Sequence, residues 1–259
     1  MALVVGMPVF MLEWRPGLFL VEVLAFLVPA WVYMRLMRGR WDGVFAVGPR
    51  TALGLVLAIP AAVGIWVVAD AFGDWVTQLV LDPDRIREIK EQLWGPVAIC
   101  GTVEEWIWTI LGVVVAPAIA EEVLFRGVIQ RGLARRWRPW PALLITSFIF
   151  AAFHFPLLQF PVFFVLGLEF GWLYQRSGSV WPGILAHAAN NLLAIVDLNV
   201  PAISEGLVAN LGWLRLIVGS LFGAAVALVF FGVLTRGRRP RVAKVIVLPE
   251  TLPGGPTRP

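Results

Sequence analysis

Charged and polar side chains interrupt three apolar segments of this 259-residue sequence, and both histidines of the chain are among them. A carboxylate and two imidazoles that converge on one point can activate a water molecule for hydrolysis. An ionisable group inside a bilayer costs about 2.5–3.5 kcal/mol on insertion scales, so such groups usually face a bundle interior and serve a function. The candidates are Glu121, Glu122 and Arg126 in the first segment, His154 in the second, and His187, Asn190 and Asn191 in the third.

Helical spacing gives these residues different roles. Residues three or four apart share a helix face, so Glu122 and Arg126 are expected to form a structural salt bridge. Glu121 lies about 100° further round the helix and is therefore free for chemistry. His187 and Asn191 share one face of the third segment. Each segment is thus predicted to present one polar cluster to the interior.

Two kinds of hydrolysis fit this set of residues. In the first, Glu121 takes the proton of a water molecule that His154 also holds, while His187 and Asn191 stabilise the oxyanion formed from an amide carbonyl. In the second, a zinc ion bound by His154, His187 and Glu121 activates the water. The residues alone leave both routes open.

The same residues form three motifs that resemble those of the CPBP family of intramembrane proteases, which includes CAAX prenyl protease 2 and the Abi-like proteins. Glu-Glu-x-x-x-Arg stands at 121–126, Phe-x-x-x-His at 150–154 and His-x-x-x-Asn at 187–191. The resemblance covers residues 116–193. It implies a helical bundle that hydrolyses a peptide bond near the membrane, with Glu121, His154, His187 and Asn191 as the catalytic groups.

Composition independently predicts a membrane protein. Hydrophobic residues make up 59% of the chain and charged residues only 15%, whereas soluble domains are about one quarter charged. The mean hydropathy is +0.81. The 13 tryptophans suit the two membrane interfaces. We therefore expect an all-α polytopic transmembrane bundle with the lipid bilayer as its surroundings.

Apolar runs of sufficient length predict about seven spans. Residues 1–235 should form the membrane-embedded protease domain, and 236–259 a basic, flexible tail. The polar stretch Trp75–Leu93 should lie along the membrane surface. The expected spans are Gly17–Leu36, Leu53–Ala71, Trp106–Leu124, Pro141–Leu158, Pro161–Tyr174, Val180–Ile195 and Leu211–Leu234.

Arginines predict the orientation. They follow the first, third, fifth and last of these runs, and basic loops stay in the cytosol. The N-terminus should then lie outside and the C-terminus in the cytosol, as a multi-pass protein of the plasma membrane if the source is prokaryotic. The catalytic cavity should open on the cytosolic side.

Three functions compete. The first is an intramembrane endopeptidase that acts on a membrane-associated protein or lipidated peptide, such as a prenylated CAAX sequence. The second is a catalytically idle family member that serves as a membrane immunity or scaffold protein. A transporter with a proton relay is disfavoured because no inverted repeat is visible. Nucleic acid is not expected as a partner, since the arginines that give the net charge of +4 follow apolar runs.

Overall fold

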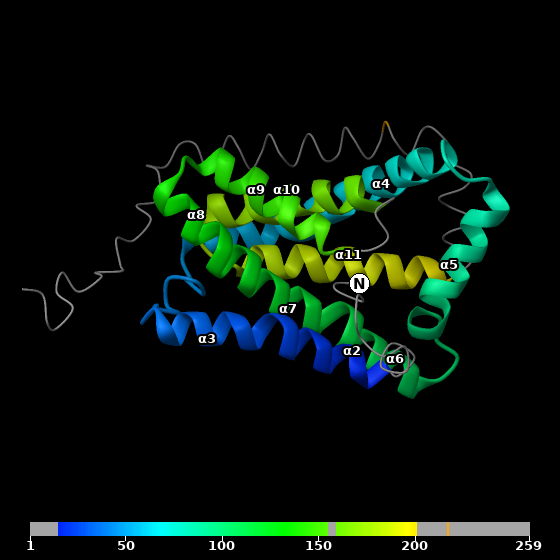
Figure 1. Ribbon diagram of the computed structural model, residues 1–259, viewed down its shortest axis with the longest axis horizontal. Coiled ribbons are helices and arrows are strands. Elements are labelled where there is room, and N and C mark those ends of the chain that lie inside the picture. The colour runs from blue at the N-terminus through cyan, green and yellow to red at the C-terminus, as the bar shows by residue number, and fades with distance from the viewer. Residues whose placement is uncertain (1–14, 155–158, 201–216, 218–259) are drawn as a thin grey trace, which may run out of the picture.

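The computed structural model describes residues 15–154, 159–200 and 217, and within this part of the chain it contains helices and no strand. The predicted seventh span and the basic tail lie outside the described residues. Most of the helices run back and forth along one long axis, and the helix Pro83–Ala98 lies across it at one end (Figure 1). The described part is therefore an elongated helical bundle, as the composition predicts.

The first long helix contains a wide turn of π-helix. The helices α2 (Arg15–Glu22) and α3 (Val28–Leu36) are joined by the π-helical segment η1 (Val23–Leu27). Helix α4 (Pro49–Gln78) carries none of the three motifs. It begins with Pro49, whose fixed φ suits the first helical turn.

The helix that carries the first motif is built from five consecutive segments. The two π-helical segments flank α7, and such segments are frequent at functional sites. The segments are α6 (Val103–Thr109), η2 (Ile110–Val115), α7 (Ala116–Glu122), η3 (Val123–Gln130) and α8 (Arg131–Arg136).

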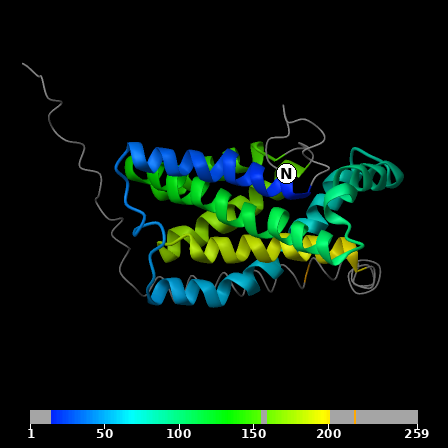
Figure 2. The ribbon, with the colours of Figure 1, turned by 90° about the horizontal axis from the view of Figure 1, so that it is seen from below.

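Three helices complete the bundle: α9 (Pro139–Ala152), α10 (Phe160–Ser177) and α11 (Trp181–Asn199). Helix α11 packs against α4 on one side and against α7 on the other, and α10 packs on α4, α9 and α11. In Figure 2 the α2–α3 helix and α4 lie on opposite sides of α7 and α11. The second and third motifs are therefore carried by helices that neighbour the first.

Within the described residues, three helices are long and apolar enough to cross a bilayer: Arg15–Leu36, Pro49–Ala69 and Val103–Arg136. These match three of the expected spans. Helix α9 has 14 residues, or about 21 Å, and polar groups dilute the hydropathy of α10 and α11. The chain is thus an integral membrane protein, while the count of about seven spans stays a prediction.

The predicted surface helix Trp75–Leu93 is wrong in its boundaries. Helix α4 continues to Gln78, and a separate helix, α5 (Pro83–Ala98), follows. The side chain of Asp82 accepts a hydrogen bond from the backbone N–H of Arg85 at 2.9 Å. This cap and Pro83 start a new helix here, because the capping carboxylate satisfies a backbone N–H of the first turn and the fixed φ of proline suits that turn.

The basic connections meet at one end of the bundle, at the left of Figure 1. The backbone N–H of Val180 donates to the carbonyl of Val44 at 3.1 Å, and the amide of Gln175 donates to the carbonyl of Pro139 at 2.6 Å. These contacts join the α3–α4, α8–α9 and α10–α11 connections. The alternation of arginine-rich loops that the sequence predicts is therefore matched by the topology.

The opposite end is held by Arg15 and Asn199. Arg15 donates to Thr109 Oγ1 and to the carbonyl of Ile99, both at 2.6 Å. The side chain of Asn199 accepts from the backbone N–H of Cys100 and donates to the carbonyl of Ala98, both at 2.7 Å. The first and last described helices are thus tied to the same connection between α5 and α6.

This connection gives a stability prediction. Asn199→Leu removes both hydrogen bonds and takes from the backbone N–H of Cys100 its acceptor, so the free energy of unfolding should fall by about 1–3 kcal/mol. Thermal unfolding in detergent measures the effect. Leu198→Asn, a change at the neighbouring exposed position, serves as control. An unchanged unfolding temperature for Asn199→Leu would show that these contacts do not hold the end of the bundle.

Candidate active site

The first motif lies where α7 meets η3. Glu121 is 2% exposed and Glu122 is fully buried. Nη1 of Arg126 donates to Oε1 of Glu122 at 2.7 Å, which is the predicted structural pair. Nη2 of Arg126 donates to the carbonyl of Gly167 in α10 at 3.1 Å. The ion pair therefore fastens the first motif to α10.

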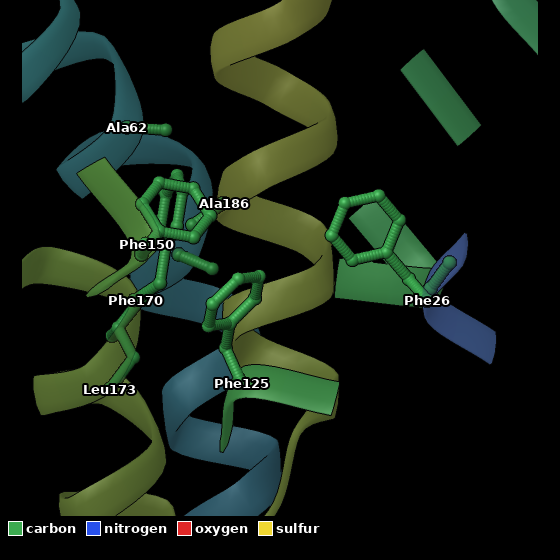
Figure 3. Close-up of a cluster of buried hydrophobic side chains, with 9 residues drawn as sticks. Phe26, Ala62, Phe125, Phe150, Phe170, Leu173 and Ala186 are labelled. Atoms are coloured by element: carbon green, nitrogen blue, oxygen red, sulfur yellow. The ribbon is translucent and has the colours of Figure 1, made fainter. Parts of the chain in front are cut away.

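Phenylalanine rings enclose the buried guanidinium. Its Cζ lies 4.6 Å from the ring centroid of Phe150 and 5.4 Å from that of Phe170. A cation over an aromatic face is stabilised by the ring quadrupole. Figure 3 shows Phe150 and Phe170 side by side in this core, with Phe125 next to them. The phenylalanine of the second motif thus supports the arginine of the first.

His154 faces Glu121 from the end of α9. Its Nε2 lies 3.8 Å from Oε2 of Glu121, an atom with no hydrogen-bond partner in the described structure. The Nδ1 of His154 lies 2.8 Å from the carbonyl oxygen of Phe150. Because a carbonyl only accepts, Nδ1 carries the hydrogen, and the Nε2 of a neutral ring presents its lone pair toward Glu121.

His187 is held by Glu122 rather than by Glu121. Its Nδ1 lies 3.3 Å from Oε1 of Glu122. Its ring stacks on Phe170, with centroids 4.7 Å apart and an interplanar angle of 13°. Phe150 contacts both imidazoles, at 4.6 Å from His154 and 6.0 Å from His187. The structure therefore brings both histidines next to one phenylalanine ring.

Asn191 and Asn190 have different surroundings. Nδ2 of Asn191 donates to the carbonyl of Val113 in η2 at 2.9 Å, so its contact is with the helix of the first motif. Asn190 is buried, and its Nδ2 donates to Oε2 of Glu169 at 3.4 Å. Glu169 of α10 fits none of the three motifs and could have paired with an arginine or a helix end, and the structure gives it Asn190 as a partner.

The donors proposed for zinc do not form one group. Within the described ranges, no three side chains of histidine, cysteine, aspartate or glutamate lie close enough together to hold a metal ion. Glu121 approaches His154, whereas His187 approaches Glu122. The arrangement does not fit a zinc ion bound by Glu121, His154 and His187, and no step of the mechanism below passes through one.

Two carboxylates have roles that the sequence did not reveal. Glu122 links Arg126 to His187, which spacing along one helix cannot predict. Glu22, on α2, is 7% exposed and one of its carboxyl oxygens has no partner in the described structure. A single acidic residue in the middle of the first apolar run was the available signal for Glu22.

Comparison with known proteins agrees with the motifs. Residues 103–193 match the family described as "Type II CAAX prenyl endopeptidase Rce1-like". This Rce1-like segment resembles members of that family. The resemblance to CPBP proteases is thereby confirmed. The Rce1-like segment begins at the start of α6 and ends within α11, so it includes all three motifs.

A curated relative points the same way. The chain is 30% identical over 113 residues to a protein of Bacillus subtilis (strain 168) named "Putative membrane peptidase YdiL". The match covers 44% of this chain and 46% of that protein, so it spans about half the length of the relative. No solved structure matches the chain significantly.

The close approach of α11 to the Rce1-like motif gives a second prediction. A Cβ atom at Gly183 would lie 2.8 Å from Oε2 of Glu122. Gly183→Ala should therefore push Glu122 away from His187 and lower activity about 10- to 100-fold, since small misplacements near reacting groups are costly. Gly132→Ala, where a Cβ meets nothing within 4 Å, is the matched control. Equal peptidase rates for the two variants would contradict the positioning of His187 by Glu122.

Proposed function

We propose that the chain is an intramembrane endopeptidase in which Glu121 activates the attacking water. The observation that carries the proposal is the approach of Oε2 of Glu121 to Nε2 of His154 at 3.8 Å. This separation is too long for a direct hydrogen bond but suits a bridging water molecule. Both atoms can accept a hydrogen from that water, which leaves its oxygen lone pairs free to attack a carbonyl carbon.

The remaining residues serve the developing oxyanion. Glu122 accepts from Nδ1 of His187, and the imidazolium form of that ring, which carries a hydrogen on both nitrogens, also donates through Nε2. Asn191 uses one amide hydrogen on the carbonyl of Val113 and retains a second for the substrate. Such donors stabilise the charge that forms as water attacks the amide carbonyl. The proton taken by Glu121 then passes to the leaving amine.

The substrate is proposed from the family match and the membrane setting. The Rce1-like description names CAAX prenyl endopeptidases, so a prenylated CAAX peptide is the first substrate to test. The apolar helices suit a lipidated peptide that reaches the site from the bilayer. We also propose that the arginine-rich end of the bundle faces the cytosol, with the site reached from that side.

Peptide cleavage tests this function. Purified protein in lipid nanodiscs should cleave a fluorogenic prenylated CAAX peptide faster than its unprenylated twin, with and without a chelator. Equal cleavage rates for the two peptides would support a peptidase but contradict specificity for the prenyl group. Loss of activity with chelator, restored by zinc, would contradict the metal-free route. A folded protein that cleaves neither peptide but binds a membrane protein would favour the idle immunity or scaffold role.

A further inference from the structure

Glu22 is a buried acidic residue that lies outside the Rce1-like segment and outside the mechanism above. It ends α2, directly before the wide turn η1. Its side chain is 7% exposed, and Oε2 has no hydrogen-bond partner in the described structure. A carboxyl in the middle of an apolar span is costly and is retained for a function more often than for packing.

The packing of two phenylalanines shows which way Glu22 faces. Phe26 lies four residues after Glu22, and Phe125 lies four residues after Glu121, so each shares a helix face with its glutamate. The rings of Phe26 and Phe125 approach to 6.2 Å between centroids. Figure 3 shows Phe26 reaching from the first helix toward Phe125. The faces that carry Glu22 and Glu121 therefore oppose each other.

Other contacts agree with this arrangement. Both α2 and η1 pack against α7, and the carboxyl of Glu22 interacts electrostatically with that of Glu121. Phe26 also lies 6.5 Å from Phe153, the residue before His154. The face of the first helix that carries Glu22 therefore lies next to the proposed position of the water between Glu121 and His154.

We propose that Glu22 is a positioning residue of the active site, whose carboxyl pairs with that of Glu121 and holds it in the orientation that faces His154. Two neighbouring carboxylates repel when both are ionised, so a shared proton or a bridging water must join them. Oε2 of Glu22, which has no partner in the described structure, is available for this link, while Oε2 of Glu121 faces His154. The proposal rests on the proposed peptidase function of Glu121.

Two substitutions separate positioning from packing. Glu22→Leu removes the hydrogen-bonding group but suits an apolar helix, so kcat should fall about 10- to 100-fold with little change in KM. Its unfolding temperature should be unchanged or higher by about 2–4 °C. Glu22→Gln keeps size and hydrogen bonding and should retain most of the activity. Leu24→Gln, on the exposed side of η1, is the control and should leave kcat unchanged.

A thermal double-mutant cycle tests the pairing without any substrate. The shifts in unfolding temperature of Glu22→Leu and Glu121→Leu should not add in the double variant, because each removes the same interaction. Additive shifts, or full kcat in Glu22→Leu, would overturn the proposal. If even the wild-type protein cleaves no peptide, non-additive shifts still support the carboxyl pair, and only the peptidase function fails.

Discussion

Replacing His154 with glutamine should lower kcat/KM about 10²- to 10⁴-fold, the range attributed to a positioned acid or base. The ring is fixed on two sides. Its Nδ1 donates to the carbonyl of Phe150 at 2.8 Å, and its face stacks on Phe163 with centroids 4.0 Å apart. Glutamine cannot keep both contacts and also present an acceptor to the water beside Glu121.

The loss of kcat/KM caused by His154→Gln should not increase when Glu121 is also replaced. Because His154 and Glu121 are proposed to hold one water molecule, His154→Gln combined with Glu121→Gln should be about as inactive as either single variant. Steady-state rates on the prenylated peptide measure this. Ser147→Ala, on the same helix and equally buried, is the control and should keep the wild-type rate. Multiplying losses in the double variant would indicate independent roles.

Replacing Arg126 with leucine should reduce the free energy of unfolding by about 3–5 kcal/mol, as when one partner of a buried ion pair is removed. Glu122 would keep its buried charge without the guanidinium that lies 2.7 Å away, and the carbonyl of Gly167 would lose its donor. For a chain of this size the loss corresponds to a fall of roughly 10 °C in unfolding temperature.

The partner of this ion pair provides the control. In Glu122→Leu/Arg126→Leu neither charge remains, so part of the stability should return even though His187 loses its acceptor. Thermal unfolding of both variants in the same detergent makes the comparison. An Arg126→Leu protein as stable as wild type would mean that the pair contributes nothing to stability. The same conclusion would follow if the double variant lost as much stability as the single variants Arg126→Leu and Glu122→Leu lose together.

The sequence predicted the elements of the fold because its signals were local. Apolar length located three spans, and i,i+4 spacing predicted the pair of Glu122 and Arg126, which the structure confirms. The break at Asp82 was missed because hydrophobic residues continue at helical spacing through it, whereas the cap and Pro83 decide where the new helix starts.

Contacts between different helices could not be predicted from the sequence. The link from Glu122 to His187 joins α7 to α11, and the link from Glu169 to Asn190 joins α10 to α11. Both depend on the rotation of one helix against another. For the link from Glu122, the π-helical segments η2 and η3 alter this rotation by widening the turns on either side of α7. A residue pattern read on a regular helix therefore assigns partners within a segment but not across segments.

The most direct test of the role of Glu121 is cleavage of a prenylated CAAX peptide by the wild-type protein and by Glu121→Gln, followed by mass spectrometry of the products. We predict that the wild-type protein releases a carboxyl-terminal fragment from one defined bond. The Glu121→Gln variant should have the unfolding temperature of the wild-type protein, which shows that it is folded, and should release no fragment above background. Equal cleavage by the two proteins would contradict the assignment of Glu121 as the residue that activates water.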